Sequence, residues 1–297
     1  MTEWTKQIIL PVDQAPLSIK EQLIRWRIPR RIRGQFRIER RIRLNGRYQP
    51  TSTILQPGDV LEMTWRETDF EVADSHYVPD ERQSLVILYE NEDMLVVNKL
   101  KGVKTHPNSP GEDGTMMNFA QAYLAKQGKS AYMVHRLDGD TTGALIIGKN
   151  PYVVPMLNQY LRDKEIKRTY LAWVEGTLDA LRGTITAPIG DNPLNARTRQ
   201  VNVPNAQTAV THWQKIHTVY QKTLVRVVLE TGRTHQIRVH MQSIGHPLVG
   251  DPLYNVNSNY AEGLLLHAAG LQLPIPFTNE LKSIGAPLPA SFPKQLK

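Results

Sequence analysis

The sequence predicts a mixed α/β or α+β protein built in two unequal parts. Three observations support this prediction. The chain has 297 residues, of which 40% are hydrophobic, which is enough for one large core or two unequal ones. Arginine dominates a short segment near the N-terminus, between Ser18 and Tyr48. From Leu85 onward, apolar stretches of strand length are mixed with helical stretches.

Residues 1–66 form the smaller predicted part. A short helix is expected from about Ile19 to Arg27, and a strand from Ile38 to Asn45, where Ile and Leu alternate with arginine. Asn45-Gly46 marks a turn at the end of that strand, and Pro57-Gly58-Asp59 marks a second turn. The segment therefore predicts a small α/β unit.

The positive charge of the chain is concentrated in this N-terminal part. The whole chain carries a formal charge of +8, whereas Ser18 to Tyr48 alone carries +9, with ten arginines and one lysine against two glutamates. Arginine binds phosphate through a planar, two-pronged donor, so a polyanionic partner is expected. The candidate contacts are Arg30, Arg31, Arg40 and Arg41. A solvated basic face is the alternative, although such faces are normally interleaved with acids.

A change of composition separates the two parts. Residues 67–84 are acidic, contain Pro79 and hold few large aliphatic residues, which predicts a linker that few contacts cross. Residues 85–297 form the larger predicted domain. Its expected strands are Leu85–Tyr89, Met94–Val97, Ala144–Ile147, Tyr170–Val174 and Leu224–Glu230, and its expected helix is Met116–Lys126. The proline-rich tail from Leu273 is expected to wrap the surface irregularly.

Composition and spacing exclude several classes of protein. Cysteine is absent, which rules out disulfides, thiolate metal sites and cysteine nucleophiles. Charges begin at Glu3, and no run of about 18 apolar residues occurs, so we expect an unsecreted, cytoplasmic protein with no membrane contact. No metal is expected, because His235 and His240 are five positions apart with no acid between them, unlike a zinc-protease helix.

The first of two polar clusters lies just before an apolar strand. It reads His135-Arg136-Leu137-Asp138-Gly139-Asp140-Thr141-Thr142-Gly143, and a loop in that place presents side chains where a rigid sheet begins. An aspartate followed by Thr and Gly is also typical of an Asx turn, so Asp138 alone does not decide between catalysis and a turn. A two-acid glycosidase pair with Asp140 is disfavoured, because hydrolysis needs an acid at a set separation across the scissile bond.

The second polar cluster, Thr231 to His240, directly follows an apolar strand. Thr231 or Thr234 is expected to cap a helix that begins nearby. On such a helix, His235 and Arg238 lie about one turn apart on the same face, so Arg238 can point at a carboxylate. The residues alone thus suggest an Asp–Arg site, although an arginine on a helix is usually solvated.

The first cluster resembles the H-R-L-D-x-x-T-S-G signature of pseudouridine synthases of the RluA/RluD type, which act on large-subunit ribosomal RNA and on transfer RNA. Thr142 stands where the signature usually has serine. The agreement continues in order from about Leu85 to Phe292. The matching stretches are Tyr89-Glu90, Val96 to Lys99 before Gly102, Lys167 to Ala172 with Val174 and Gly176, Leu229 to His240, Gly245 to Tyr254, and Leu264 to Ala268. Several motifs in the right order are far more specific than any one of them.

The resemblance has two departures and a weaker N-terminal extension. Leu100 stands where the family usually has proline, and Gly139 follows the aspartate, but neither change removes a charged group. Ile42 to Gly46 and Gly58 to Leu61 are similar to the end of the small RNA-binding domain named after a ribosomal small-subunit protein. The resemblance therefore implies an α+β fold, with a mixed, largely antiparallel sheet in residues 85–297 and a small RNA-binding domain before it.

The resemblance implies an isomerase that needs neither cofactor nor metal. Pseudouridine formation breaks an N-glycosidic bond, rotates the uracil and rejoins it through carbon, so the implied essential group is the ionised carboxylate of Asp138. Arg238 is implied as its ion-pair partner, and Tyr170 as the ring that lies over the uracil and helps move the proton from carbon 5. Arg136 is implied to fill the place that the extruded uridine leaves in the RNA stack. The other RNA contacts expected here are His135, Thr141, Arg233 and Gln236.

Alternatives stay open for single residues and for the whole chain. Tyr170 could be a core residue of its strand, and Arg136 could hold its own loop. A non-catalytic RNA-binding or ribosome-assembly protein with the same fold is the main rival, and the intact Asp138, Tyr170 and Arg238 argue against it. A nucleoside glycosidase is a second rival, which would release free uracil. The expected partner is ribosomal or transfer RNA rather than DNA, and the expected state is a monomer.

Overall fold

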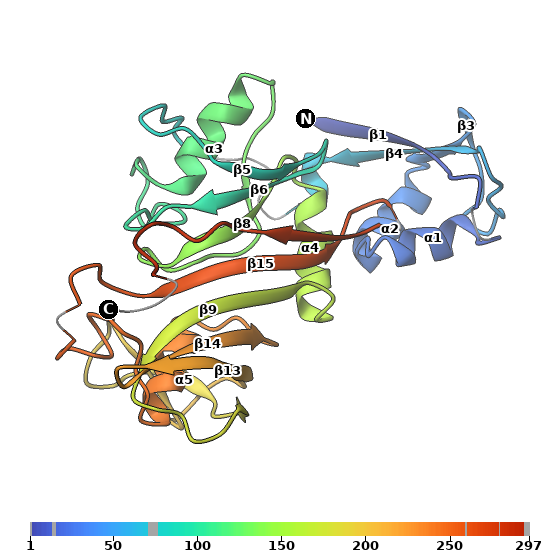
Figure 1. The fold of residues 1–297 in the computed structure, drawn as a ribbon. Helices are drawn as coiled ribbons and strands as arrows, with labels where there is room; N and C mark the ends of the chain where they lie inside the picture. Colours follow the sequence, from blue (N-terminus) through green and yellow to red (C-terminus); the bar gives the residue numbers. More distant parts are fainter. Residues whose placement is uncertain (1, 14–15, 71–76, 259, 279, 294–297) are drawn as a thin grey trace.

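The largest feature of the structure is a ten-stranded sheet (Figure 1). This computed structural model describes residues 2–13, 16–70, 77–258, 260–278 and 280–293. The main path of the sheet is β10-β13-β14-β9-β15-β8-β6-β5, with β16 paired to β15 and β7 paired to β8. Its strands are β5 (Ile87–Glu90), β6 (Met94–Lys99), β7 (Tyr132–Met133), β8 (Thr142–Gly148), β9 (Lys167–Glu175), β10 (Arg182–Ile185), β13 (Thr211–Val219), β14 (Lys222–Leu229), β15 (Leu266–Pro274) and β16 (Leu281–Gly285). Among the described strands, every pairing of this sheet is antiparallel except that of β15 with β8, which confirms the α+β class.

The parallel pairing fixes the place where the first polar cluster enters the sheet. His267 on β15 lies opposite Thr142 on β8, and Ala268 lies opposite Gly143. Gly143 has a φ of +108°, and a Cβ atom there would lie 2.2 Å from the carbonyl oxygen of Ala268. Only glycine allows this close approach of two backbones. The loop of residues 134–141 is thereby anchored at its C-terminal end.

Helices cover both faces of this sheet (Figure 1). α3 (Met116–Ala125) and α5 (Gln236–Ser243) share a core with Leu145 and Ile147 of β8 on one face. α4 (Val153–Arg162) packs on the other face, where the alternate residues of β8 point. Every residue of β8 is buried, as expected for a strand that is covered on both sides.

A four-stranded sheet with order β1-β4-β2-β3 forms the N-terminal part. Its elements are β1 (Glu3–Ile9), α1 (Ile19–Arg25), α2 (Arg30–Ile38), β2 (Ile42–Leu44), β3 (Arg47–Tyr48), β4 (Val60–Arg66) and the 3-10 turn η1 (Glu67–Asp69). The expected first helix is present, and Ser18 and Glu21 form a capping box at its start. Both expected turns are present, with positive φ at Asn45, Gly46 and Gly58. The short strands β11 (Ile189–Asp191) and β12 (Arg199–Val201) form a separate hairpin.

The strand expected from Ile38 to Asn45 is much shorter than predicted. Ile38 is the last residue of α2, and β2 contains only three residues. The residues before Ile38 follow a helical spacing instead, since Ile32 and Phe36, four positions apart, are the buried residues of α2. Arg40 then adopts a φ of +53°, which ends the helical path before the strand begins.

The N-terminal part and the large sheet share one hydrophobic core. Trp65 at the end of β4 stacks on Tyr152 with ring centroids 4.3 Å apart, and Phe277 packs edge-on against both rings. Across the same boundary, Lys6 Nζ lies 2.8 Å from the carboxylate of the buried Asp93. The expectation of few contacts across the boundary is therefore wrong. The prediction rested on the composition of residues 67–84, which does not show whether the N-terminal part and the large sheet have apolar faces that pack together.

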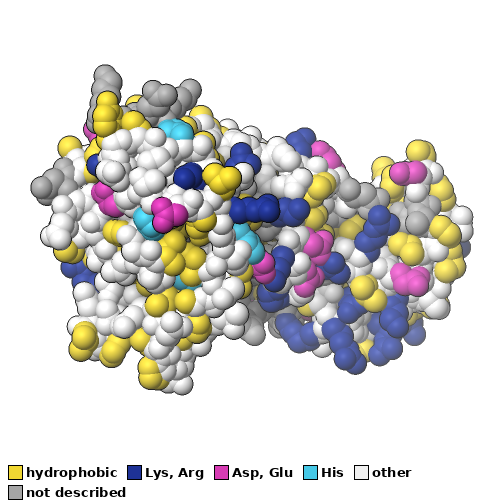
Figure 2. Space-filling view, turned by 60° about the horizontal axis from the view of Figure 1, so that its bottom comes forward, with side chains coloured by type: hydrophobic (Ala, Val, Ile, Leu, Met, Phe, Trp, Pro, Cys, Tyr) yellow, Lys and Arg dark blue, Asp and Glu magenta, His cyan; other side chains and the backbone are white. Residues whose placement is uncertain are grey.

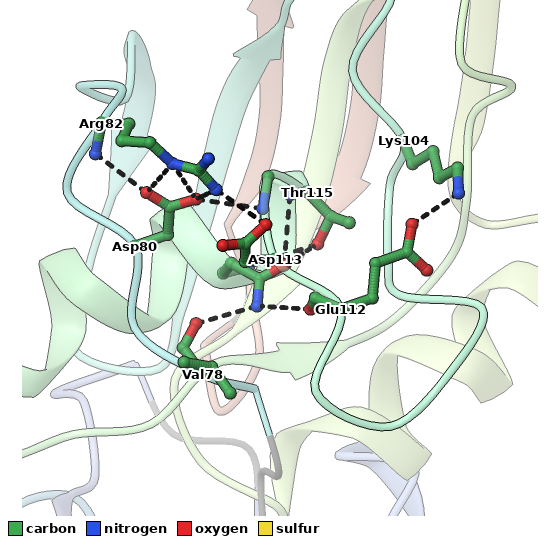
Figure 3. A network of polar contacts seen from close by, with 9 residues as sticks. Val78, Asp80, Arg82, Lys104, Glu112, Asp113 and Thr115 are labelled. Carbon is green, nitrogen blue, oxygen red and sulfur yellow. Dashed lines mark hydrogen bonds and ion pairs between the residues drawn. The ribbon is translucent and has the colours of Figure 1, made fainter.

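The described part of the predicted linker is itself tightly held. Asp69 is buried and accepts two hydrogen bonds from the Arg41 guanidinium, at 2.6 and 2.9 Å. Asp80 is also buried, and it accepts from Arg82 and from the backbone N–H of Gly114 (Figure 3). The Arg82 guanidinium holds the pKa of the Asp80 carboxyl well below its usual range. Asp69 and Asp80 therefore hold the chain in place and are not solvated residues of a flexible linker.

The C-terminal tail is more regular than its prolines predict. β15 extends through Leu273 to Pro274, and β16 pairs with it in antiparallel register, with Leu271 opposite Ile284. The expected irregular wrap is therefore wrong for Leu273–Pro274 and for Leu281–Gly285, which are strand residues. Pro274 is the last residue of its strand, a position that a proline tolerates.

Candidate active site

The loop that carries Asp138 is fixed by a threonine from a neighbouring segment. The Thr105 hydroxyl donates to the Leu137 carbonyl at 2.7 Å and accepts from the Leu137 N–H at 3.0 Å. Thr105 and Leu137 are both buried. The backbone N–H and carbonyl of Leu137, the residue before Asp138, are thus both held by one side chain, while the Asp138 side chain is 19% exposed.

Lys99 at the end of β6 is the second support of this loop. Its ammonium group donates to three backbone carbonyls, those of Leu100, Gly139 and Thr141, at 2.9, 2.6 and 2.9 Å. Burial lowers the pKa of Lys99 to about 7, and the nearby Asp140 and Asp138 oppose that shift. Each ammonium proton has an acceptor, so Lys99 ties the part of the loop that follows Asp138 to the sheet.

Arg238 on α5 reaches Asp138 and is itself clamped from behind. Its Nη1 lies 3.2 Å from Asp138 Oδ2. Its Nε and Nη2 each donate at 2.8 Å to the two oxygens of Asp251, which forms a bidentate pair. Asp251 is fully buried, and its Oδ1 also accepts the N–H groups of Leu253 and Tyr254. The expected ion pair between Asp138 and Arg238 is present, and Asp251 orients it.

The charges of this cluster leave Asp138 partly unneutralised. Burial lowers the pKa of Arg238, but the Asp251 and Asp138 carboxylates more than offset that effect, so the net pKa is raised. Arg238 is therefore permanently charged. Since one guanidinium faces two carboxylates, and Asp251 holds it with two hydrogen bonds, Asp138 retains negative charge that a substrate can use.

His235 is the residue directly before α5, with a φ of +58°. Its Nδ1 lies 2.9 Å from the Tyr254 hydroxyl, and its Nε2 lies 3.9 Å from Asp138 Oδ2. Burial lowers the pKa of His235, with Asp138 opposing the shift, so the ring is neutral at pH 7. His235 and Arg238 both face Asp138, as their spacing predicted.

Neither Thr231 nor Thr234 caps α5, so that expectation is wrong. The N-cap residue is His235, which forms no side-chain capping bond. Instead, the Thr231 hydroxyl donates to Gln236 Oε1 at 2.8 Å, and the same oxygen accepts the Arg233 N–H at 2.9 Å. Gln236 is only 2% exposed and its side chain holds this turn together, so its expected contact with RNA stays a prediction.

Tyr170 on β9 lines the same cavity as Asp138 and Arg238. The cavity has a volume of about 510 Å³, within the roughly 300–1,000 Å³ that ligand pockets usually have. Tyr170 is only 6% exposed, and burial raises the pKa of its phenol. A loop, a strand and a helix thus bring the three expected catalytic residues to one cavity.

Basic residues outnumber acids around this cavity. The lysines and arginines among its described lining residues are Arg136, Arg162, Lys164, Arg168, Arg233 and Arg238. The acids are Asp138 and Glu230, and Glu230 is already paired with Lys164 and with His212. A cavity with this excess of positive charge suits a polyanionic ligand.

The remaining residues expected to touch RNA at this cavity divide into exposed and structural ones. Arg136 and Arg233 are both exposed at the cavity. His135 Nε2 accepts the Ile146 N–H at 3.0 Å, and burial lowers the pKa of His135 to about 3, so its neutral ring supports β8. Thr141 is 2% exposed. His135 and Thr141 support the scaffold and also line the cavity, and their contacts with RNA stay predictions.

The four candidate arginines of the N-terminal part differ in exposure. Arg30 and Arg40 are exposed. Arg31 is also exposed, but it donates to the backbone carbonyl of Asp69. Arg41 is 7% exposed and pairs with Asp69, so it cannot reach RNA, and the expectation for it is wrong. Figure 2 shows Lys and Arg side chains gathered over the side of the molecule that the N-terminal elements occupy.

Two charged residues of the site were missed by reasoning from the sequence. Lys99 is the last residue of the otherwise largely apolar strand β6, and Asp251 lies in a mostly uncharged stretch. A charge in such a setting signals a buried partner, because a charged side chain is buried only when it is paired or hydrogen-bonded. Among the described residues, no cluster of three or more His, Asp or Glu side chains could hold a metal ion. No helix in the described part of the chain is long and apolar enough to span a membrane.

The sequence matches two family models. The model described as RNA pseudouridylate synthase covers residues 93–243, a range that includes Asp138, Tyr170 and Arg238. The model described as the RluD ribosomal pseudouridine synthase N-terminal domain covers residues 6–61. The two matches fall on the large sheet and on the N-terminal part.

Curated relatives and solved structures agree with these matches. An uncharacterized RNA pseudouridine synthase of Bacillus subtilis, YhcT, is 41% identical over 228 residues, which cover 75% of each chain. Ribosomal large subunit pseudouridine synthase D of Nitrosomonas europaea is 39% identical over 216 residues, covering 69% of this chain and 62% of that protein. The structure of human RNA Pseudouridylate Synthase Domain Containing 1 aligns with a TM-score of 0.59 and 27% identity, covering 71% of this chain and 86% of that one. The chain therefore belongs to the RNA pseudouridylate synthases, a family of isomerases that act on uridines in RNA.

Proposed function

We propose that this enzyme isomerises chosen uridines of ribosomal or transfer RNA through Asp138. The observation that carries the proposal is the state of this carboxylate. Arg238 and His235 contact it through Oδ2, and among the described residues Oδ1 has no hydrogen-bond partner. Glu230, the other acid at the cavity, is already paired with Lys164. Asp138 is thus the carboxylate that is oriented and available to a substrate.

The arrangement supports chemistry at the anomeric carbon. The reaction breaks the bond between C1′ and N1 of the uridine and joins C1′ to C5 of the rotated uracil. An ionised carboxylate beside the ribose stabilises or traps the positive charge that develops at C1′. The guanidinium of Arg238 lies 3.2 Å from the Asp138 carboxylate and orients it, while Asp251 takes the other two hydrogen-bonding positions of the guanidinium. No cofactor is required for these steps.

Tyr170 is proposed to hold the uracil and to help move the proton from C5. Because burial raises its pKa, the phenol keeps its proton at neutral pH. This favours a role as an aromatic surface and a hydroxyl relay over a role as a tyrosinate base. Extrusion of the uridine from the RNA stack costs a few kcal/mol, which stacking and phosphate contacts can offset. The exposed Arg136 is proposed to fill the vacated place.

Two grounds support ribosomal RNA as a substrate, and transfer RNA is proposed from the motif resemblance alone. Two relatives are named ribosomal large subunit pseudouridine synthase D, and the family model matching the N-terminal part is a ribosomal pseudouridine synthase domain. The N-terminal domain, residues 1–66, is proposed to bind RNA through its exposed arginines, Arg30 and Arg40 first. We propose that the enzyme works as a monomer and meets these RNAs in the cytoplasm.

The test compares Asp138→Asn with wild type on unmodified ribosomal and transfer RNA transcripts. The amide keeps the shape of the side chain but loses the charge, so isomerisation should disappear while RNA affinity stays within several-fold. Asp140→Asn is the matched control, because it changes a carboxylate of the same loop. It should retain turnover. The readout is pseudouridine in digested RNA, measured by mass spectrometry, together with binding.

Three results would contradict the proposal. Full turnover by Asp138→Asn would show that the carboxylate is not the reacting group. Release of free uracil by wild type would indicate a glycosidase. Tight RNA binding by wild type with no nucleoside change in any transcript would indicate a non-catalytic RNA-binding protein. Mapping pseudouridine in RNA from cells with and without the gene identifies the position.

A further inference from the structure

Arg168, near the start of β9, is a buried cation without a counterion. It is 9% exposed, and its guanidinium lies at the wall of the catalytic cavity. Its Nη2 donates to the Thr231 carbonyl at 3.1 Å. Its Nε is buried and has no hydrogen-bond partner, and no carboxylate among the described residues forms an ion pair with it. A buried guanidinium without an acid is costly, so its persistence calls for an explanation.

The acids nearest to this wall of the cavity are already engaged. Glu230 pairs with Lys164 and accepts from His212 Nε2 at 2.6 Å. Asp138 is bound by Arg238. In the described part of the chain, the carboxylates of Asp138 and Glu230 are paired with other cations and none pairs with Arg168, which is the arrangement expected of a site for an external anion.

The backbone beside Arg168 is shaped to admit the guanidinium. A Cβ atom on Gly232 would lie 2.7 Å from Arg168 Nη1, so any other residue at this position would push the guanidinium away. Arg168 and Tyr170 are two positions apart on one strand and therefore point to the same face. The cation thus stands beside the ring proposed to hold the uracil. Its field is felt there, because Arg168 opposes the rise in the pKa of Tyr170 that burial causes.

We propose that Arg168 binds a backbone phosphate of the RNA directly next to the uridine in the cavity. The inference rests on the proposed function and adds a positioning contact to it. A phosphate is favoured over a uracil carbonyl, because a neutral acceptor would leave the buried charge unbalanced, whereas a phosphate oxygen pairs with it and suits its donor geometry. This contact holds the ribose of that uridine in place beside Asp138.

The experiment combines phosphate neutralisation with substitution of the arginine. A hairpin containing the mapped uridine is made with a single methylphosphonate at each of the four linkages nearest the uridine. The ribose before each linkage carries a 2′-O-methyl group for stability, and a phosphodiester hairpin with the same 2′-O-methyl group is the reference. Single-turnover rates and dissociation constants are measured for wild type, Arg168→Gln and Arg168→Lys. Arg226→Gln, an exposed arginine on the adjacent strand β14, is the matched control.

One linkage should stand out in wild type. Neutralising this linkage should lower the ratio of the single-turnover rate to the dissociation constant at least about tenfold. This is the size expected for the loss of one charge-assisted contact. Arg168→Gln should lose a similar factor on the phosphodiester hairpin and almost nothing more at that linkage, while Arg168→Lys should recover part of the loss. Arg226→Gln should keep the wild-type penalty. The salt slope of binding should fall by about 0.7 in Arg168→Gln, as for one phosphate contact.

The results that overturn the inference differ from those that overturn the proposed function. If all four linkages can be neutralised in wild type without loss, or if the penalties in wild type and Arg168→Gln simply multiply, Arg168 does not bind a phosphate. The wild-type scan decides this even if Arg168→Gln fails to fold. If wild type forms no pseudouridine in the unmodified hairpin or in any transcript, the proposed function fails and the inference with it.

Discussion

Asp251→Asn is the sharpest test of how the catalytic cluster is held. The substitution keeps an oxygen that can accept the N–H groups of Leu253 and Tyr254, so the local turn should survive. It removes one of the two oxygens with which residue 251 accepts from Arg238, and it turns an NH2 group toward a guanidinium donor. The buried Arg238 then has only Asp138 as a counterion.

The structure allows the size of this effect to be worked out. Asp251 is fully buried, and breaking a buried ion pair costs roughly 3–5 kcal/mol. At roughly 2–4 °C per kcal/mol, the Tm should fall by about 6–20 °C. Because Arg238 loses the clamp that orients it, the Asp138 carboxylate should shift by a fraction of an ångström to about 1 Å, and a displacement of that size lowers the rate about 100-fold.

The assay is single-turnover isomerisation at a temperature where the variant is folded, with RNA affinity measured in parallel. The rate should fall while the dissociation constant stays near that of wild type, because Asp251 is fully buried and presents no surface to the RNA. Asp191→Asn is the control. Asp191 lies 3.0 Å from Arg199 but is 86% exposed, so its loss should cost less than about 1 kcal/mol. A folded Asp251→Asn with an unchanged rate would refute the idea that Asp251 positions Arg238.

Two further predictions concern RNA binding and acid stability. Replacing the exposed Arg30 and Arg40 together by Gln should lower the salt slope of RNA binding by up to about 1.4, since each single-strand phosphate contact accounts for about 0.7; an unchanged slope at equal protein concentration would exclude both as contacts. His135 has a folded pKa of about 3 against about 6.5 in the unfolded chain. Between these two pH values the unfolded chain binds a proton that the folded chain does not. The free energy of unfolding should therefore decrease as the pH is lowered from about 6.5 to about 3, by up to about 1.4 kcal/mol per pH unit. Urea unfolding of His135→Gln, whose oxygen can still accept the Ile146 N–H, should show a shallower fall, and equal slopes would contradict this origin.

The sequence predicted the elements that carry the site better than the residues that support it. The loop before β8, the strand with Tyr170 and the helix with Arg238 were all expected, because their motifs combine apolar periodicity with charged residues at fixed places. Asp251 was not expected, since its partner Arg238 lies 13 positions away and no local pattern links them. A helical cap at Thr231 or Thr234 was predicted from residue type alone, but the N-cap residue is His235 and the Thr231 hydroxyl donates to Gln236 instead.

The neighbours Arg40 and Arg41 show why the sequence predicted the amount of positive charge but not which arginines are exposed. Both belong to the same basic run, yet Arg40 is exposed and Arg41 is buried against Asp69, 28 positions later. A basic pattern has the same composition whether a residue faces solvent or a distant acid. The same limit explains the linker, where the buried Asp69 and Asp80 looked like solvated charges.

The core that joins Trp65, Tyr152 and Phe277 has a consequence for the choice of substrate. If the N-terminal arginines bind RNA as proposed, their separation from the catalytic cavity is constant, because a shared core does not permit the two parts to swing independently. All adjustment then falls on the RNA, which must bend or unpair until its phosphates and its uridine match that spacing. The cost of this deformation depends on nucleotides that the protein never touches. Loosening the packing around Trp65 should therefore widen the range of uridines that react before it weakens the binding of RNA.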